Sequence, residues 1–193
     1  MHMGVSTYVS RVTVAGLELE LLRPVSPEDL IDEEAFAQDE FLPYWAELWP
    51  AATALAEALP DVSGLRVVEL GCGLGVTSLV AAAKGAKVTA TDWAPEAIEL
   101  LRANAERNGI ALRAEVRDWR EPWDERFDLA LAADVLYERR NVEPLLARLR
   151  ELAPAALVGL AGRPYEAELI RQARESGERV EQVGKLLRLG EER

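Results

Sequence analysis

Three glycines separated by single residues make the most informative stretch of this chain. Residues 65–75 read Leu-Arg-Val-Val-Glu-Leu-Gly-Cys-Gly-Leu-Gly, and Asp92 follows 17 residues after the last glycine. Glycine lets a backbone turn sharply and approach a ligand with no Cβ in the way. An acid after the next strand can accept hydrogen bonds from ribose hydroxyls. The stretch therefore predicts a nucleoside-binding site in the order strand, glycine loop, helix, strand, acid.

The spacing of the glycines narrows the choice of ligand. Residue 76 is Val, so the pattern is Gly-x-Gly-x-Gly rather than the Gly-x-Gly-x-x-Gly of dinucleotide sites. Glu69, two residues before Gly71, would repel a diphosphate but can attract a cationic group. We therefore favour a ligand with a ribose, a positive charge and no phosphate, such as S-adenosylmethionine. A NAD(H)-dependent reductase and a purely structural turn are the alternatives.

Hydrophobic periodicity predicts the elements that position these residues. Short apolar runs predict parallel strands at residues 67–70, 87–91, 112–117, 127–137 (with its exit) and 155–160. Helical patterns alternate with them at residues 76–85, 94–109, 143–152 and 165–176, and residues 179–189 predict a final antiparallel hairpin turned at Gly184. This order predicts an α/β fold, Rossmann-like, with a mostly parallel seven-stranded sheet flanked by helices.

The N-terminal part precedes that pattern. Strands at residues 8–14 and 17–22 predict a β-hairpin extension, and the seven acids within residues 28–40 predict a surface helix and loop. An aromatic-rich segment, residues 41–50, leads into a helix at residues 51–59. We expect a single domain over residues 1–193, with the hairpin and acidic segment in residues 1–40 and the Rossmann-like core in residues 41–193.

Further site residues are predicted at the carboxyl ends of the strands, where ligands bind in open parallel sheets. Asp118 can accept a hydrogen bond from an adenine amino group and Trp119 can border the ring, although Asp118 could also be an ordinary surface turn residue. Ala133 is small, as is needed where substrate and cofactor meet. Trp49, at a helix start, could present a π face to a sulfonium.

Three motifs together resemble one known family. The sequence Glu-x-Gly-x-Gly-x-Gly at residues 69–75 is similar to motif I of the class I, seven-strand methyltransferases. Trp49-Pro50-Ala51-Ala52 and the Asp-x-x-Tyr sequence of residues 134–137 are similar to the methyltransferase-like protein lysine methyltransferases, the group that acts on the electron-transfer flavoprotein β-subunit and on Hsp70. The resemblance covers roughly residues 36–160.

The resemblance implies S-adenosylmethionine as cofactor and a lysine side chain of a protein as methyl acceptor. It implies Asp134 and Tyr137 as catalytic residues. The residues expected at the cofactor are Trp49, Glu69, Gly71, Cys72, Gly73, Gly75, Asp92, Trp93, Asp118, Trp119 and Ala133. Two alternatives remain: a small-molecule N-methyltransferase, because Tyr44, Trp45 and Trp49 would suit a flat ring, and a non-catalytic module that binds the cofactor or its product S-adenosylhomocysteine.

Composition argues against several other classes. The 34 acidic and 22 basic residues leave a net charge of −12, which disfavours nucleic acid and would attract a basic substrate. The single His, at position 2, disfavours a His base or a metal site, and the single Cys excludes an intramolecular disulfide. No apolar run is long enough to span a membrane and no signal-peptide pattern begins the chain, so we expect a cytoplasmic protein, monomeric or weakly dimeric.

Overall fold

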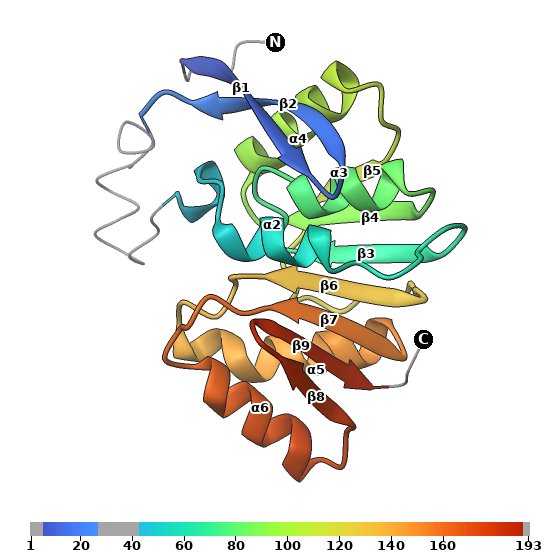
Figure 1. Ribbon diagram of the computed structural model, residues 1–193. Coiled ribbons are helices and arrows are strands. Elements are labelled where there is room, and N and C mark those ends of the chain that lie inside the picture. Colours follow the sequence, from blue (N-terminus) through green and yellow to red (C-terminus); the bar gives the residue numbers. More distant parts are fainter. Residues whose placement is uncertain (1–5, 27–42, 191–193) are drawn as a thin grey trace.

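The computed structural model describes residues 6–26 and 43–190, which form a two-stranded hairpin and a seven-stranded sheet with helices on both faces (Figure 1). The sheet order is β5(Arg113–Val116), β4(Lys87–Asp92), β3(Arg66–Leu70), β6(Leu129–Ala133), β7(Ala155–Gly159), β9(Leu186–Gly190) and β8(Val180–Val183). The first five are parallel, and β9 runs antiparallel to both β7 and β8. The predicted fold is confirmed, whereas the acidic segment at residues 28–40 lies outside the described residues.

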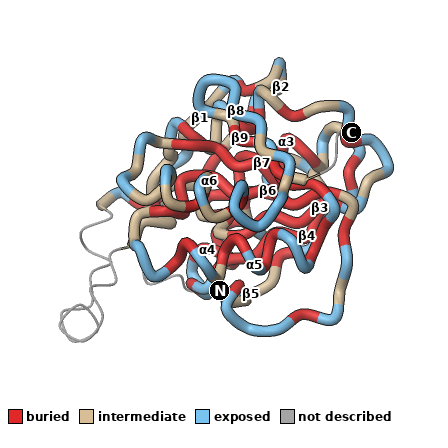
Figure 2. The backbone as a smooth tube through the Cα atoms, turned by 90° about the horizontal axis from the view of Figure 1, so that it is seen from below, coloured by how far each residue is buried: buried red, intermediate tan, exposed pale blue. Residues whose placement is uncertain are grey.

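Two apolar clusters cover the two faces of the sheet. Helices α2(Pro50–Glu57), α3(Val76–Ala83) and α4(Pro95–Arg107) contribute to one cluster, and α5(Val142–Leu152) and α6(Glu166–Glu175) to the other. Alternate residues of the central strands point to opposite clusters, so Val67 belongs to the first and Val68 to the second. The central strands are therefore buried on both faces, as Figure 2 shows. None of the helices in the described ranges is long and apolar enough to cross a membrane.

The strand order places a topological switch between β3 and β6. After β3 the chain builds outward through β4 and β5, then returns to pair β6 with the other edge of β3. Loops leaving β3 and β6 diverge at such a point, so ligands bind there. The predicted site residues at the ends of β3, β4 and β6 all meet at this edge of the sheet.

Some boundaries differ from the predicted ones by a few residues. The strand predicted from residue 127 begins at Leu129. Just before it, the Asp128 carboxylate accepts hydrogen bonds from the Arg66 backbone N–H and guanidinium at the start of β3. The helix predicted from residue 51 begins at Pro50, whose missing N–H costs nothing in a first helical turn.

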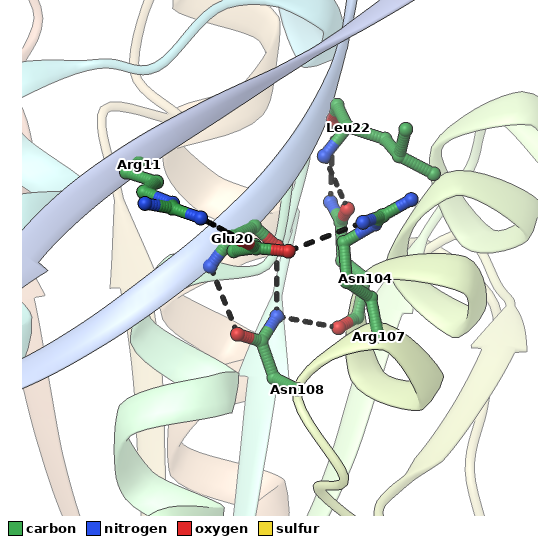
Figure 3. Close-up of polar contacts among 6 residues, drawn as sticks. All are labelled: Arg11, Glu20, Leu22, Asn104, Arg107 and Asn108. Atoms are coloured by element: carbon green, nitrogen blue, oxygen red, sulfur yellow. Dashed lines mark hydrogen bonds and ion pairs between the residues drawn. The ribbon is translucent and has the colours of Figure 1, made fainter.

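The N-terminal hairpin, β1(Thr7–Val14) and β2(Leu17–Pro24), is confirmed and is held by two Asn side chains, one in the last turns of α4 and one at its C-cap (Figure 3). Asn104 Oδ1 accepts from the Leu22 N–H at 2.7 Å, and Asn108 exchanges two hydrogen bonds with the Glu20 backbone at 2.8 and 2.9 Å. Asn104 and Asn108 are four helical residues apart, a rise of about 6 Å, and their partners Leu22 and Glu20 are two strand residues apart, about 6.6 Å. The two distances match, so each Asn lies opposite its partner. The two side-chain amides thus hydrogen-bond to the edge of β2 that β1 leaves open, as the backbone of a neighbouring strand would.

Asn104 also reaches the glycine loop, because its Nδ2 donates to the Leu74 carbonyl at 3.4 Å. We expect Asn104→Ala to lower the melting temperature by about 4–8 °C, since Asn104 is fully buried and its loss leaves the half-buried backbone groups of Leu22 and the buried Leu74 carbonyl without this partner, at a cost of about 2 kcal/mol. Scanning fluorimetry measures the change. Asn108→Ala is the matched control, because Asn108 is partly exposed and water can replace its bonds; an equal shift in both variants would contradict this account.

Candidate cofactor and acceptor site

A cavity of about 660 Å³, part of it open to solvent, lies at the carboxyl ends of β3, β4 and β6. Every predicted site residue lines it except Asp118. Eight further residues line the cavity that the sequence did not assign to the site, or, for Tyr44 and Trp45, assigned only under the small-molecule alternative. They are Tyr44, Trp45, Glu47, Leu48, Ala52, Leu74, Val76 and Val135. Five of these lie close to Trp49 in the sequence, four before α2 and one in its first turn. The segment that leads into α2 therefore forms one wall of the cavity.

The glycine loop brings the backbone against this cavity. Gly71, Gly73 and Gly75 all have positive φ angles, of 71°, 52° and 81°, which explains the alternating glycines. A Cβ on Gly71 would come within 2.8 Å of Val135 and 3.1 Å of Trp119, both of which line the cavity. A side chain at position 71 would therefore collide with two residues that line the cavity, which explains why glycine is needed there.

Asp92 ends β4 and is buried beside the glycine loop. Its Oδ2 accepts from the Gly73 N–H at 2.9 Å and its Oδ1 from the Ala94 N–H at 3.0 Å. Burial raises the pKa of Asp92 to about 6, against the lowering effect of these N–H groups. The carboxylate therefore fixes the loop and still presents acceptor lone pairs to the cavity.

The predicted adenine end differs in detail from the expectation. Asp118 lies in a neighbouring hollow with Trp93 and Trp119, and its carboxylate is paired with the Arg120 guanidinium and backbone N–H. Trp119 lines both the hollow and the main cavity. Its indole N–H is buried and has no hydrogen-bond partner among the described residues. The part of Trp119 next to Gly71 is its six-membered ring, so Trp119 presents a ring face or edge, rather than its N–H, where a nucleobase is expected.

Glu69 is fully buried in β3, and the Ser78 hydroxyl at the start of α3 donates to its Oε2. Burial raises the pKa of Glu69 to about 7, although Ser78 and Thr77 oppose the shift and Asp92 adds to it. The Glu69 side chain therefore titrates near neutral pH and carries its negative charge, suited to a cationic ligand, only above that range.

These shifts predict how stability depends on pH. The folded protein holds a proton on Glu69 up to about pH 7, whereas an unfolded Glu releases it near pH 4.5. The folded state therefore binds more protons in between, and its stability falls as the pH rises through this window. We expect Glu69→Gln to raise the melting temperature at pH 8 by several degrees and to flatten the decline from pH 5 to 8. Glu106→Gln, at an exposed position, controls for net charge; a decline unchanged by Glu69→Gln would refute the assignment.

The other end of the cavity is formed by Asp134, which follows β6. Its φ of 54° is left-handed, a conformation that Asp tolerates better than most side chains. The carboxylate is almost completely buried and accepts two hydrogen bonds from Arg163, from Nε at 2.6 Å and from Nη2 at 2.9 Å. Sequence reasoning missed Arg163. The only available signal was its place just beyond β7, next to the strand that carries Asp134.

Aromatic rings enclose Asp134. Tyr137 and Tyr44 have ring centroids 4.6 Å apart, and Trp49 lies 6.4 Å from Tyr44 with its indole N–H bonded to the Tyr44 carbonyl. The Arg163 guanidinium lies 5.3 Å from the Trp49 ring. Burial raises the pKa of the Tyr137 phenol, so Tyr137 is a neutral hydrogen-bonding group rather than a base.

The cavity fits S-adenosylmethionine in three respects. The backbone of the glycine loop lines it, the acid at Asp92 is suited to ribose hydroxyls, and the Trp119 ring borders the place where an adenine is expected. A family model described as lysine methyltransferase matches residues 38–165, about two thirds of the chain. The chain belongs to the lysine methyltransferase family. The family and cofactor predicted from the sequence are thereby confirmed.

Named members of this family align with part of the chain. It is 37% identical over 128 residues to the protein N-lysine methyltransferase METTL21A of zebrafish (Danio rerio), an alignment that covers 60% of this chain and 58% of the relative. It is 38% identical over 117 residues to the electron transfer flavoprotein beta subunit lysine methyltransferase of the same species, covering 53% and 42%. The chain thus spans about half the length of the curated relatives it matches.

Solved structures support the fold. The 16S rRNA N2 G1207 methyltransferase RsmC of Thermus thermophilus, solved with S-adenosylmethionine and guanosine, superposes with a TM-score of 0.67 at 19% identity. That superposition covers 96% of this lysine methyltransferase family member and 51% of RsmC. At this identity the likeness concerns the fold alone, which agrees with the strand order described above.

Proposed function

We propose that the protein transfers a methyl group from S-adenosylmethionine to a lysine side-chain amine of a protein substrate. The observation that carries this proposal is one cavity with a nucleoside-type end at Asp92 and the glycine loop, and a buried carboxylate of the Asp-x-x-Tyr motif at its other end. The similarity to protein lysine methyltransferases supports the choice of acceptor.

At the cofactor end, Asp92 would hold the ribose hydroxyls and the glycine loop would contact the ligand through its backbone. Trp119 would border the adenine, and Trp49 and Glu69 would face the cationic end. The cofactor supplies a methyl on a positively charged sulfur: a new N–C bond forms as the C–S bond breaks, and sulfur keeps the electron pair. The protein must therefore align the acceptor and exclude water.

At the acceptor end, Asp134 would accept a hydrogen bond from the lysine amine. This bond would aim the lone pair of the lysine nitrogen along the cavity. Tyr137 and Tyr44 would wall the channel through which the side chain enters, and their apolar faces suit its methylene groups. A lysine amine has an unperturbed pKa of about 10.4, so it must lose a proton before it can react. The proton is lost to bulk water before the amine reaches Asp134, so the neutral amine is the form that enters the site.

The remaining expectations from the sequence stay predictions. They are a single domain, a cytoplasmic location, a monomer or weak dimer, and no nucleic-acid partner. A salt-dependent capture of a basic substrate by the acidic segment at residues 28–40 also remains a prediction, because that segment lies outside the described residues.

The experiment that tests the function combines binding and transfer. Calorimetric titration of S-adenosylmethionine and S-adenosylhomocysteine comes first, followed by incubation with tritiated cofactor and lysate of the host cell. Binding with a labelled protein band supports protein methylation. Binding with label only in small amines supports a small-molecule acceptor instead, and no binding overturns the proposal.

A further inference from the structure

The Arg163–Asp134 pair has a consequence for the acceptor amine. Asp134 has almost no solvent exposure, so a charge there is paired with Arg163 rather than screened by water. The guanidinium binds side-on through two nitrogens, an arrangement that fixes the carboxylate in one plane. An ionised carboxylate has about four lone-pair sites, and this arrangement leaves others for a further donor.

Arg163 is itself held in place from several sides. Its loop is fixed by Glu166, whose Oε1 accepts from the backbone N–H groups of Ala161 and Gly162 at 2.7 and 3.0 Å. The Trp49 ring lies against the guanidinium. The hydrogen bonds with Asp134 raise the pKa of Arg163, so the cation persists at every pH at which the protein is folded. The pair is therefore a preformed feature of the site.

An unpaired carboxylate would hinder the proposed reaction. An opposite charge within about 4–6 Å favours the charged form of an amine by roughly one to three pKa units. A lone Asp134 would thus hold the lysine as ammonium, which has no lone pair to attack a methyl group. The Arg163–Asp134 pair as a whole has little net charge, so the carboxylate can accept a hydrogen bond without this effect.

We propose that Arg163 is a positioning residue that neutralises Asp134, so that the carboxylate orients the acceptor amine without keeping it protonated. This inference rests on the proposed lysine methylation. Arg163 acts through Asp134 and need not touch the acceptor.

The other titratable groups around Asp134 do not replace Arg163. Tyr44 and Tyr137 are phenols, and Glu47 is paired with Arg23 at 3.3 Å. Glu166 is occupied by backbone N–H groups. Glu69 and Asp92 lie deeper, at the ends of β3 and β4, and would add negative charge when ionised. Loss of Arg163 would therefore leave the buried Asp134 with no cation to pair with except an incoming ammonium.

The test measures binding of a lysine analogue and needs no turnover. The probe, Nα-acetyl-lysine N-methylamide, is titrated by NMR into the complex with S-adenosylhomocysteine between pH 7 and 10.5. Wild-type protein should bind it more tightly as the pH rises, because the site accepts the neutral amine. Arg163→Met should bind the ammonium form at pH 7.5 at least tenfold more tightly than wild type, and this binding should weaken above pH 10.

Two further variants separate charge from structure. Arg163→Lys keeps the charge without the two-nitrogen contact and should retain the wild-type direction of pH dependence. Arg139→Met removes a matched Arg from the exposed pair with Glu168 and should change nothing. Unchanged affinity for S-adenosylhomocysteine shows that each variant is folded.

The inference is overturned if Arg163→Met keeps the wild-type pH dependence, or if Arg163→Lys behaves like Arg163→Met. Failure of the wild-type protein to methylate any protein would remove the proposed function, and this is measured separately with tritiated cofactor. With an acceptor protein in hand, the pH profile of kcat for Arg163→Met should move upward by about one to two units while KM falls.

Discussion

Asp134→Asn is expected to bind S-adenosylmethionine as tightly as the wild-type protein and to transfer methyl groups at least about 100-fold more slowly. Asn tolerates the left-handed backbone at this position, so the loop after β6 should keep its shape. The amide lacks the negative charge that pairs with Arg163, and one of its two ends is a donor that faces the guanidinium. The acceptor amine would lose its alignment, and misalignment alone costs about this factor.

Calorimetry and initial rates with tritiated cofactor check both parts of this expectation. Asp124→Asn removes the same charge from an exposed loop and serves as the control. A wild-type rate in Asp134→Asn would show that the carboxylate does not orient the acceptor. Lost cofactor binding would assign Asp134 to the cofactor end instead, and normal binding without turnover would rule out the non-catalytic module.

The second large effect is expected at the cofactor end. Asp92→Asn should weaken S-adenosylmethionine binding about tenfold to 100-fold, because hydrogen bonds to a charged acceptor are worth about 1.5–3 kcal/mol and each 1.4 kcal/mol is tenfold. One amide oxygen cannot serve both Gly73 and Ala94, so the glycine loop also loses a contact. The wild-type affinity should decline as the pH falls through about 7 and again through about 6, where first Glu69 and then Asp92 take up a proton, and the variant should lack only the second decline.

Asp118→Asn is the informative comparison for this measurement. Its carboxylate is engaged by Arg120 and lies outside the lining of the main cavity, so we expect a smaller loss of affinity. If Asp118→Asn weakens binding as much as Asp92→Asn does, Asp118 turns into the cavity when the cofactor binds. If Asp92→Asn binds normally, the ribose assignment is wrong.

The cofactor end of the site is predictable from the sequence because its parts are local. Gly71 follows β3 and Asp92 ends β4 in one β-α-β unit, and the topology of that unit brings them together whatever the rest of the chain does. The central strands are equally predictable from the sequence, because strands buried on both faces need continuous runs of apolar residues.

The acceptor end is less predictable, because its contacts join distant parts of the chain. Arg163 and Asp134 are 29 residues apart and meet only because β6 and β7 are neighbours. No local pattern distinguishes Arg163 from the other arginines. Asp118 shows the opposite case: its local turn with Arg120 competes with the distant role predicted for it. The pairing of Asn104 and Asn108 with β2 likewise depends on how the hairpin docks.

The position of the single cysteine has a practical consequence. Cys72 lies inside the glycine loop, and burial raises the pKa of its thiol, so the reactive thiolate is suppressed while the loop is closed. A thiol-reactive dye or spin label therefore has one attachment point in the whole chain, and that point lines the cofactor cavity. The protein thus carries its own reporter of access to this cavity, usable in the wild-type sequence without engineering.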